Sequence, residues 1–556
     1  MLLLICLLFC CVIIGWAFAF SKLLRSNFSE GLFSTISFLG LVMFCSFLLA
    51  LPKFIALILL ATGSIFFLFF IYSSLNKPLL LKQDIITICF FLGLSIVNLA
   101  IVYGLKYRSI DDYSFWGTIS KYLFLFNQLP TNGDYIHPVY LSYIPGAASF
   151  HYLLYTLAGG YSQTLGYFAQ GLILISAFMI LFDPKYLSRS VCYLSLCFIL
   201  FTLAYGTVFA RMEVDAYVAA YLFAITWLIY KKGDSPQLIF APIIFLSLIK
   251  EIGLLFSIAA IVLLLALEKS NRKAIIYGFL ATAAVLAIKL LWKIHVTSLG
   301  FYSFAQAVNL KSAAAAFNPF NTYYHPVQVL FLKAVFFASF DYLIKTPYLV
   351  MYGLIVGLWY WLLKKSPINR ARMNKLMIIF ALFIIAYLIM LYFLQAIVFD
   401  IGHTNPQILS FHRYYNMLFL PWACIIVFMA LDSLKPQAFE SLLSRTSLTT
   451  VSLALVILIV GKIERGKKFY DHNQLYKIYA LLNKSTAQLS HNNWSVCLLN
   501  PPKPEYEVTM PLTYFFMPHR IFYPATKEQL ASCDLSLEWA DDSEISLRVH
   551  HSKELV

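Results

Sequence analysis

Two adjacent carboxylates, Asp111 and Asp112, follow an apolar run that extends from Ile85 to Gly104. About 20 apolar residues suffice to cross a bilayer as a helix, so this pair falls where a membrane surface should lie. Neighbouring carboxylates repel each other and enter lipid only at high cost. They therefore need water, a cation or a polar substrate, which makes them a candidate site. The alternative is a solvated loop flanked by interfacial aromatic residues.

A second acidic pair, Glu213 and Asp215, lies in the next turn between apolar runs on the same predicted side, just after Arg211. Because they are two residues apart, a tight turn would let both carboxylates face one cavity. There they could bind an acceptor or a divalent ion. They could equally begin a helix and complement its dipole.

Two cations lie close to apolar sequence. Lys250 stands with Glu251 inside an otherwise apolar stretch, and Arg413 opens an apolar run with Tyr414 beside it. Charges at such depth usually line a cavity, where a lysine or an arginine can bind phosphate. The alternatives are an internal pair between Lys250 and Glu251, and an Arg413 side chain that snorkels to the interface.

His137 and His325 lie in loops on the same predicted side and could belong to a substrate loop, but the histidines show no metal-ligand spacing. The sequence contains no P-loop, no glycine-rich dinucleotide turn, no HExxH and no nucleophile elbow. Carboxylates outside the membrane, buried cations and no nucleotide site indicate chemistry on a lipid-linked phosphate donor. Whether Mg²⁺ or Mn²⁺ takes part stays open.

The composition decides the fold class. Hydrophobic residues make up 61% of the chain and charged residues 12%, which predicts an all-α polytopic membrane protein. A β-barrel is excluded because the apolar segments are continuous rather than alternating. The net charge of +15 requires no nucleic acid, since basic loops that fix orientation and contact membrane lipids explain it.

About 13 apolar runs have the length of a membrane span. A further stretch, 238–250, is too short for an ordinary span, which predicts a thin, tilted or broken helix that leads to Lys250. The predicted spans are 2–20, 31–50, 53–73, 84–104, 165–183, 190–209, 214–230, 252–267, 274–294, 346–363, 375–397, 413–431 and 447–461.

The basic loops fix the orientation if segment 143–160 lies along the membrane surface instead of crossing. All short lysine- and arginine-rich loops then fall on one side, which the positive-inside rule makes cytoplasmic. Both acidic pairs, Lys250 and Arg413 fall on the opposite side.

Three parts of the chain are predicted: extra transmembrane helices over 1–83, a transmembrane core over 84–461 and a small α+β domain over 462–556. Eight of the ten cysteines lie in apolar runs and are expected to be inert packing residues. Cys497 and Cys533 lie in the polar tail and could form a disulfide if that tail is exported.

In order and side, these motifs resemble the C-type (GT-C) glycosyltransferase superfamily, which includes the protein mannosyltransferase and aminoarabinose transferase types. The resemblance covers about residues 84–431. It rests on the first acidic pair with the surface helix after it, a proline-glycine juxtamembrane segment, the second acidic pair, a Lys-x-x-Gly turn and a late Arg-x-Tyr segment. These are Asp111, Asp112 and 121–128; Pro145 and Gly146; Glu213 and Asp215; Lys250 and Gly253; and Arg413 with Tyr415.

The resemblance implies an inverting enzyme that moves a sugar from a polyprenyl-phosphate donor to a glycan, lipid or protein acceptor. Its site would face the periplasm from a bacterial inner membrane. Asp111 or Asp112 would be the general base, and Glu213 and Asp215 would bind the acceptor or a divalent ion. The donor phosphate would be bound by Lys250, Arg413 and Tyr414. Two rivals remain: an O-antigen-type ligase or polymerase, which the loop with His325 would suit, and a flippase of lipid-linked oligosaccharides.

Overall fold

The computed structural model describes most of residues 1–433 and short pieces of the tail. The gaps before 433 are 77, 132–134, 137–139, 234, 269–270, 302–307, 366–369, 400–407 and 409. Beyond 433 it describes 460–463, 495–499, 510, 513–514, 517, 520–522, 533, 535–541 and 544–549. His137 and nearly all of the predicted span 447–461 therefore lie outside the described residues.

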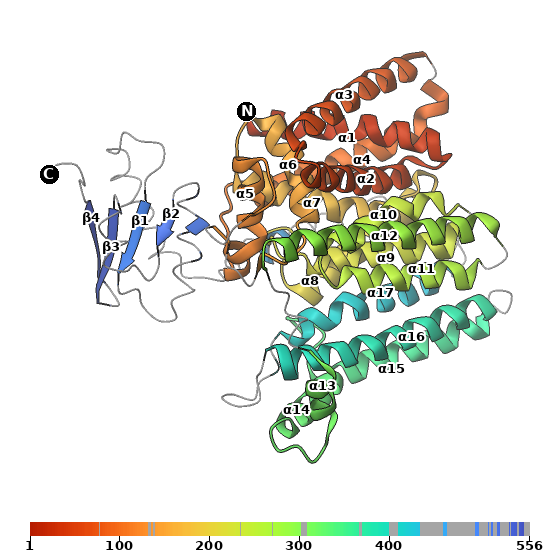
Figure 1. Cartoon of the computed structure of the whole chain (residues 1–556). Coiled ribbons are helices and arrows are strands. Elements are labelled where there is room, and N and C mark those ends of the chain that lie inside the picture. Colours follow the sequence, from red (N-terminus) through yellow and green to blue (C-terminus); the bar gives the residue numbers. More distant parts are fainter. Residues whose placement is uncertain are drawn as a thin grey trace.

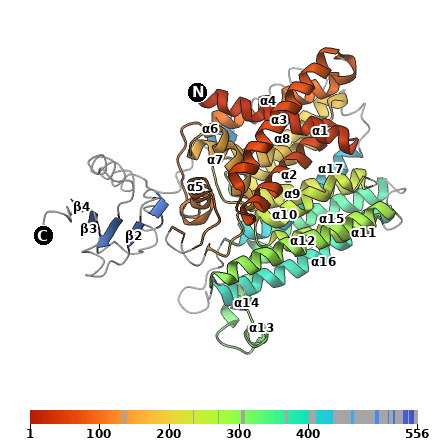
Figure 2. The same ribbon diagram turned by 45° about the horizontal axis from the view of Figure 1, so that its top comes forward.

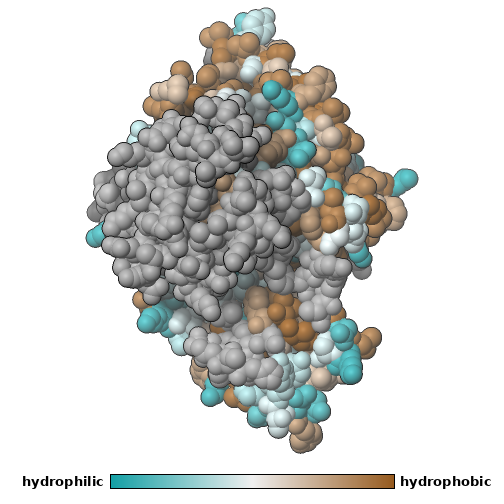
Figure 3. Space-filling view, turned by 60° about the vertical axis from the view of Figure 1, so that its left-hand side comes forward, coloured by the Kyte–Doolittle hydropathy of each residue, from teal (hydrophilic) through white to brown (hydrophobic). Residues whose placement is uncertain are grey.

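Every predicted span up to residue 431 coincides with a helix (Figure 1). In the part of the chain that the structure describes, eight helices are long and apolar enough to cross a membrane. The chain is thus an integral membrane protein by the length and composition of its helices, while the total of 13 spans stays a prediction. Exposed apolar side chains such as Phe279 and Leu382 cover their flanks, and much of the described surface in Figure 3 is brown.

Four helices form the N-terminal part, and close approach of small residues lets them pack. A Cβ on Gly15 would lie 2.1 Å from the Gly63 carbonyl oxygen, so the two helices that carry these residues touch through their backbones. The helices are α1 (Leu2–Leu24), α2 (Phe28–Leu48), α3 (Pro52–Asn76) and α4 (Pro78–Val102).

Two short helices follow, and both are buried more deeply than expected. The first is a π-helical turn η1 (Asp112–Trp116) that continues into α5 (Gly117–Phe126), and the second is α6 (Gly146–Ala158). Segment 143–160 is therefore largely helical, and its 13-residue helix is about 20 Å long at roughly 1.5 Å per residue, while its course along the membrane surface stays a prediction. It does not lie open on a surface, because every residue from Gly146 to Tyr155 is buried. Helix α6 packs against α2, α5 and α7 (Gln163–Met179).

Helices α9 (Asp215–Lys232) and α17 (Phe411–Asp432) are a parallel pair that places the second acidic pair beside Arg413. At one end Arg413 contacts Asp215, and at the other Lys231 pairs with Asp432. Helix α8 (Leu187–Tyr205) packs beside α17, and Arg189 at its start also pairs with Asp432. The acidic site and the basic loops thus lie at opposite ends of the same helices.

The short stretch 238–250 forms α10 (Gln237–Ile249), which turns directly into α11 (Gly253–Leu267). The turn is tight because a Cβ on Gly253 would lie 2.0 Å from the Leu246 carbonyl oxygen. A helix of 13 residues is about 20 Å long, less than the hydrocarbon core, so the turn with Lys250 lies below the outer membrane surface if α10 starts at the inner one.

The remaining helices lie together on the side of the bundle away from α1 to α4 (Figure 2). Helix α11 packs against both α12 and α16, while α15 packs on α17 and α14 packs on α15. Their bounds are α12 (Arg272–Ser298), α13 (Leu310–Phe317), α14 (His325–Phe337), α15 (Tyr348–Lys365) and α16 (Arg370–Phe393), which ends in the π-helical turn η6 (Leu394–Val398).

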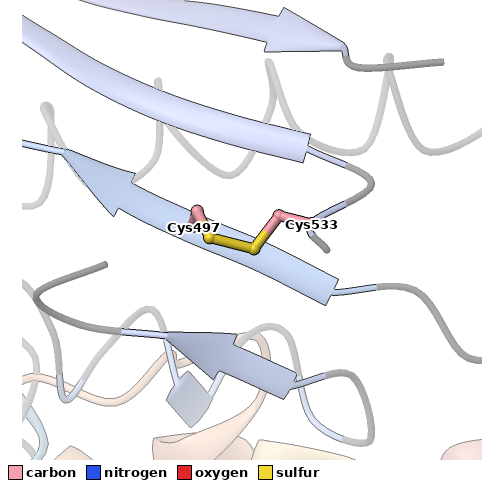
Figure 4. The surroundings of a disulfide bond; sticks show 2 residues. All are labelled: Cys497 and Cys533. Atoms are coloured by element: carbon pink, nitrogen blue, oxygen red, sulfur yellow. A yellow bond between two sulfur atoms is a disulfide. The ribbon is translucent and has the colours of Figure 1, made fainter. Parts of the chain in front are cut away.

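The tail carries a four-stranded sheet of order β2-β1-β3-β4, which Figures 1 and 2 place beyond α5 and outside the helices. Strand β1 (Ser495–Leu499) pairs parallel with β2 (Arg520–Phe522) and β3 (Leu535–Asp541), and β4 (Glu544–Val549) runs antiparallel to β3. Cys497 on β1 is disulfide-bonded to Cys533, with a Cα–Cα distance of 5.8 Å (Figure 4). The bond that the tail cysteines could form is therefore present, while the export of the tail stays a prediction.

Candidate active site

Four separate chain segments bring charged side chains together. Asp111 precedes η1, Glu213 lies in the loop before α9, Asp215 opens α9, Lys250 follows α10, and Arg413 lies in the first turn of α17. These are the residues that the sequence singled out on one predicted side. We call them, with Arg211, the charged cluster.

Arg413 is the centre of the cluster. Its Nη1 lies 2.7 Å from Asp111 Oδ2 and 3.2 Å from Glu213 Oε2, and its Nε lies 3.0 Å from Asp215 Oδ2. Only 15% of the Arg413 side chain is exposed. A guanidinium shared among carboxylates at this burial is fixed in place, which is not the arrangement of an arginine that snorkels to the interface.

Arg211 and Lys250 complete the cluster. Arg211 Nη1 donates to Glu213 Oε2 at 3.2 Å, so one carboxylate oxygen receives two guanidinium groups. Lys250 Nζ pairs with Asp215 Oδ1. The alternative in which Lys250 pairs with Glu251 is wrong, because Glu251 pairs instead with Lys289 of α12. Three cations thus face three carboxylates, and the cluster is close to neutral when all are ionised.

The pKa values of Asp111 and Glu213 are shifted in opposite directions. Burial raises the pKa of Asp111, but the Arg413 guanidinium and a hydrogen bond with Glu213 outweigh it, and the pKa lies below its ordinary value. Burial raises the pKa of Glu213 to about 7; Asp111 and Asp215 add to this, and Arg413 and Arg211 oppose it. At neutral pH Asp111 is therefore ionised, while Glu213 can carry a proton.

Asp112 differs from Asp111 in its surroundings. Its side chain is fully buried, and its carboxylate accepts backbone N–H groups from Arg108 (3.0 Å), Ser109 (3.1 Å) and Met212 (2.9 Å). Burial raises its pKa against those hydrogen bonds. Asp111 has 30% of its side chain exposed. Of the pair that the sequence could not separate, Asp111 is thus placed to meet a substrate, and Asp112 fixes the loops that carry the site.

A cavity of about 500 Å³ opens beside the charged cluster. Lys250 belongs to both. Tyr414 lines the cavity and contacts the cluster, since its ring lies 5.0 Å from Lys250 Nζ and its hydroxyl accepts from Arg413 Nη2 at 2.9 Å. Most of the remaining lining is apolar and comes from α11, α16 and η6. It includes Leu254, Leu255, Met390, Leu391, Leu394 and Val398.

The described residues do not fit a divalent cation. In that part of the chain no three His, Cys, Asp or Glu side chains are grouped to hold a metal. The carboxylates proposed as ligands, Glu213 and Asp215, already contact Arg413, which supplies the positive charge between them. We therefore derive no step through Mg²⁺ or Mn²⁺.

No described contact joins His325, one of the two predicted substrate-loop histidines, to the charged cluster. His137 lies outside the described residues. His325 opens α14 with an exposed side chain, and its backbone N–H donates to Asn321 at 3.0 Å. Helix α14 packs mainly on α15 and η6, and its Phe331 ring lies 5.5 Å from the ring of Phe411 at the start of α17.

Sequence reasoning missed Lys289, Trp116 and Tyr143, which lie in or beside the cavity wall. Lys289 carried a usable signal, because a lysine within the predicted span 274–294 and away from its ends is costly unless it has a partner. Trp116 and Tyr143 carried none beyond their place near a membrane surface.

Comparisons of the chain with protein-family models, with characterised proteins and with solved structures gave no match.

Proposed function

We propose that the protein is an integral membrane glycosyltransferase that takes a sugar from a polyprenyl-phosphate donor and passes it to a hydroxyl acceptor outside the cytoplasm. One observation carries the proposal. Lys250 of the charged cluster lines a large apolar cavity, and Tyr414, which lines the same cavity, contacts both Lys250 and Arg413. A ligand with a long apolar chain, a phosphate and a polar head would place these parts in the apolar cavity, at the cations and near the partly exposed Asp111.

In this scheme the polyprenyl chain occupies the apolar part of the cavity. Lys250 and Arg413 bind the phosphate, Lys250 as a point charge and Arg413 through its fork of donors. Both cations are already paired with carboxylates, so they are oriented before the donor arrives and need little reorganisation.

Asp111 acts as the general base because it is the most exposed carboxylate that contacts Arg413 and is ionised at neutral pH. The acceptor hydroxyl attacks the anomeric carbon from the face opposite the phosphate and transfers its proton to Asp111. The new C–O bond forms as the bond to the phosphate oxygen breaks with its electron pair, and the configuration inverts. Lys250 and Arg413 stabilise the charge that develops on the leaving phosphate.

The test uses purified protein in nanodiscs, a panel of radiolabelled polyprenyl-phosphate sugars and membrane extract as acceptor. Wild type is compared with Asp111→Asn and with Asp84→Asn, a matched change at the remote pair with Lys22. Transfer by wild type and Asp84→Asn but not by Asp111→Asn supports the proposal. If no donor yields transfer, while a fluorescent polyprenyl lipid still binds, the flippase or a ligase of preassembled glycan replaces it.

A further inference from the structure

The turn between α10 and α11 presents two opposite charges to the cavity, and they have different partners. Lys250 pairs with Asp215 in the charged cluster, whereas Glu251 Oε2 lies 3.5 Å from Lys289 Nζ on α12. Both Lys250 and Glu251 line the cavity. Glu251 has 48% of its side chain exposed, so its carboxylate is available to a ligand even though it is paired.

Lys289 supports Glu251 from behind. The Lys289 side chain is 10% exposed. Among the described residues, its Nζ forms one ion pair, with Glu251, and no hydrogen bond. A buried ammonium is costly without a counter-charge, so Lys289 favours the position in which the Glu251 carboxylate is turned toward it. Trp292, three residues on and on the same face of α12, donates to the Ser142 carbonyl oxygen at 3.0 Å and fixes α12 against this wall.

Aromatic rings line the same cavity as Glu251. Trp116, Tyr143 and Tyr414 line the same cavity, and the rings of Trp116 and Tyr143 lie 5.8 Å apart. Aromatic faces next to a charge-assisted acceptor suit a ligand group that has both apolar C–H faces and hydroxyl donors. A polyprenyl chain has no hydrogen-bond donor, so it cannot bind to a carboxylate in this way.

The opposite charges of Lys250 and Glu251 also determine which part of the ligand lies next to each residue. A phosphate is attracted to Lys250 and repelled by Glu251, so the group that contacts Glu251 must be neutral and must donate hydrogen bonds. In a polyprenyl-phosphate sugar the group next to the phosphate with that chemistry is the sugar.

We infer that Glu251, held by Lys289, accepts hydrogen bonds from hydroxyl groups of the donor sugar and determines which sugar is used. This inference rests on the proposed function, and it assigns Glu251 a role in specificity that differs from the roles of Asp111 and Lys250. Trp116 and Tyr143 would contact the apolar face of the same sugar.

The test compares wild type, Glu251→Gln and the double variant Glu251→Gln/Lys289→Met, which removes both charges and leaves no buried ammonium unpaired. Two donors that differ by one sugar hydroxyl are used, together with bare polyprenyl phosphate as a binding probe. We expect both variants to lose about 10-fold or more in kcat/KM for the hydroxylated donor, with much less discrimination against the deoxy donor. Binding of bare polyprenyl phosphate should not change.

Unchanged discrimination in both variants would overturn the inference. So would an equal loss for both donors and for bare lipid, because that pattern indicates a structural pair only. If wild type transfers no sugar, the proposed function fails, and the same variants are compared in binding of sugar-bearing and bare lipid. A preference for the sugar-bearing lipid that Glu251→Gln abolishes would still support a sugar site, and a preference that persists would overturn it.

Discussion

Arg413 Nε lies 3.0 Å from Asp215 Oδ2, although 198 residues separate the two in sequence. Both belong to the first turn of their helices, α17 and α9, which run in parallel and are joined again at their far ends through Asp432 and Lys231. The helices thus act as a frame that sets the position of the guanidinium.

Replacement of Arg413 by lysine should greatly reduce activity and leave the fold intact. Lysine keeps the charge but cannot reach Asp111, Glu213 and Asp215 at once, so we expect kcat/KM to fall by about 100-fold. Steady-state transfer and the melting temperature check this. Arg189→Lys is the matched control, because Arg189 of α8 pairs with Asp432 at the far end of α17. It should leave activity near wild type. Equal losses in the two variants would contradict the assignment.

Asp111→Asn and Asp112→Asn should fail in different ways. The amide in Asp112→Asn could keep only part of the hydrogen bonding to three backbone N–H groups, so we expect a loss of about 1–3 kcal/mol in stability. The Asp111→Asn protein should fold normally and be inactive. Thermal unfolding and transfer assays on both variants separate these effects. A stable, inactive Asp112→Asn protein would show that the two roles had been exchanged.

Donor affinity should fall as the pH rises through the pKa of Glu213, about 7. Protonated Glu213 leaves the charged cluster with one more positive charge, which favours the phosphate, and ionisation removes it. The affinity should therefore be highest below pH 7 and decline by up to about 10-fold per pH unit above it. Binding of a phosphodiester-linked donor is measured from pH 5.5 to 8.5. Glu213→Gln mimics the protonated acid and should flatten the profile.

The same pKa affects stability in a definite direction. Because the pKa of Glu213 is raised in the folded protein, the folded state binds more protons than the unfolded state between the ordinary value and 7. Its contribution to stability is then present at low pH and is lost as the pH rises through that window. Asp111, whose pKa is lowered, has the opposite effect at acidic pH.

The helices and the membership of the charged cluster were predictable, while the contacts within it were not. Apolar length marks a span directly, and the positive-inside rule placed Asp111, Glu213, Lys250 and Arg413 on one side. Which carboxylate meets which cation depends on the helix packing, and no local pattern encodes it. Asp111 and Asp112 are the clearest case, because adjacent identical residues have the same sequence signal and opposite surroundings.

Burial of α6 and the partner of Glu251 show the same limit. Segment 143–160 is predicted to lie along the membrane surface, and nothing in the sequence indicates that α2, α5 and α7 would cover it. The partner of Glu251 seemed to be its neighbour Lys250, whereas the fold brings Lys289 from another helix.

Tyr514 of the tail should stabilise the loop that carries Asp111. Its buried ring contacts the ring of Tyr107 at 5.2 Å, its hydroxyl accepts from Gln163 Nε2 at 2.7 Å, and Lys121 donates to its carbonyl oxygen at 2.6 Å. Gln163 also accepts from the Tyr107 backbone N–H, next to the loop held by Asp112. Tyr514→Ala should lower stability by about 3–5 kcal/mol and activity with it.

Tyr514→Phe serves as the graded control, because it keeps the ring and removes only the hydroxyl. We expect it to lose about 1 kcal/mol and to retain most activity. Hydrogen exchange at residues 107–116 reports on the loop directly. Wild-type exchange there in Tyr514→Ala would show that the tail does not support the site.

The bond between Cys497 and Cys533 makes the location of the tail testable in cells. Disulfides persist in oxidising compartments and are reduced in the cytosol, so export of the tail predicts that both thiols resist labelling until reductant is added. Denatured whole-cell protein is treated with a maleimide-polymer, with and without prior reduction, in a variant whose eight other cysteines are serine or alanine. A mass shift of two labels only after reduction is expected. Full labelling without reductant would place the tail in the cytosol, and by connectivity it would reverse the orientation predicted from the basic loops.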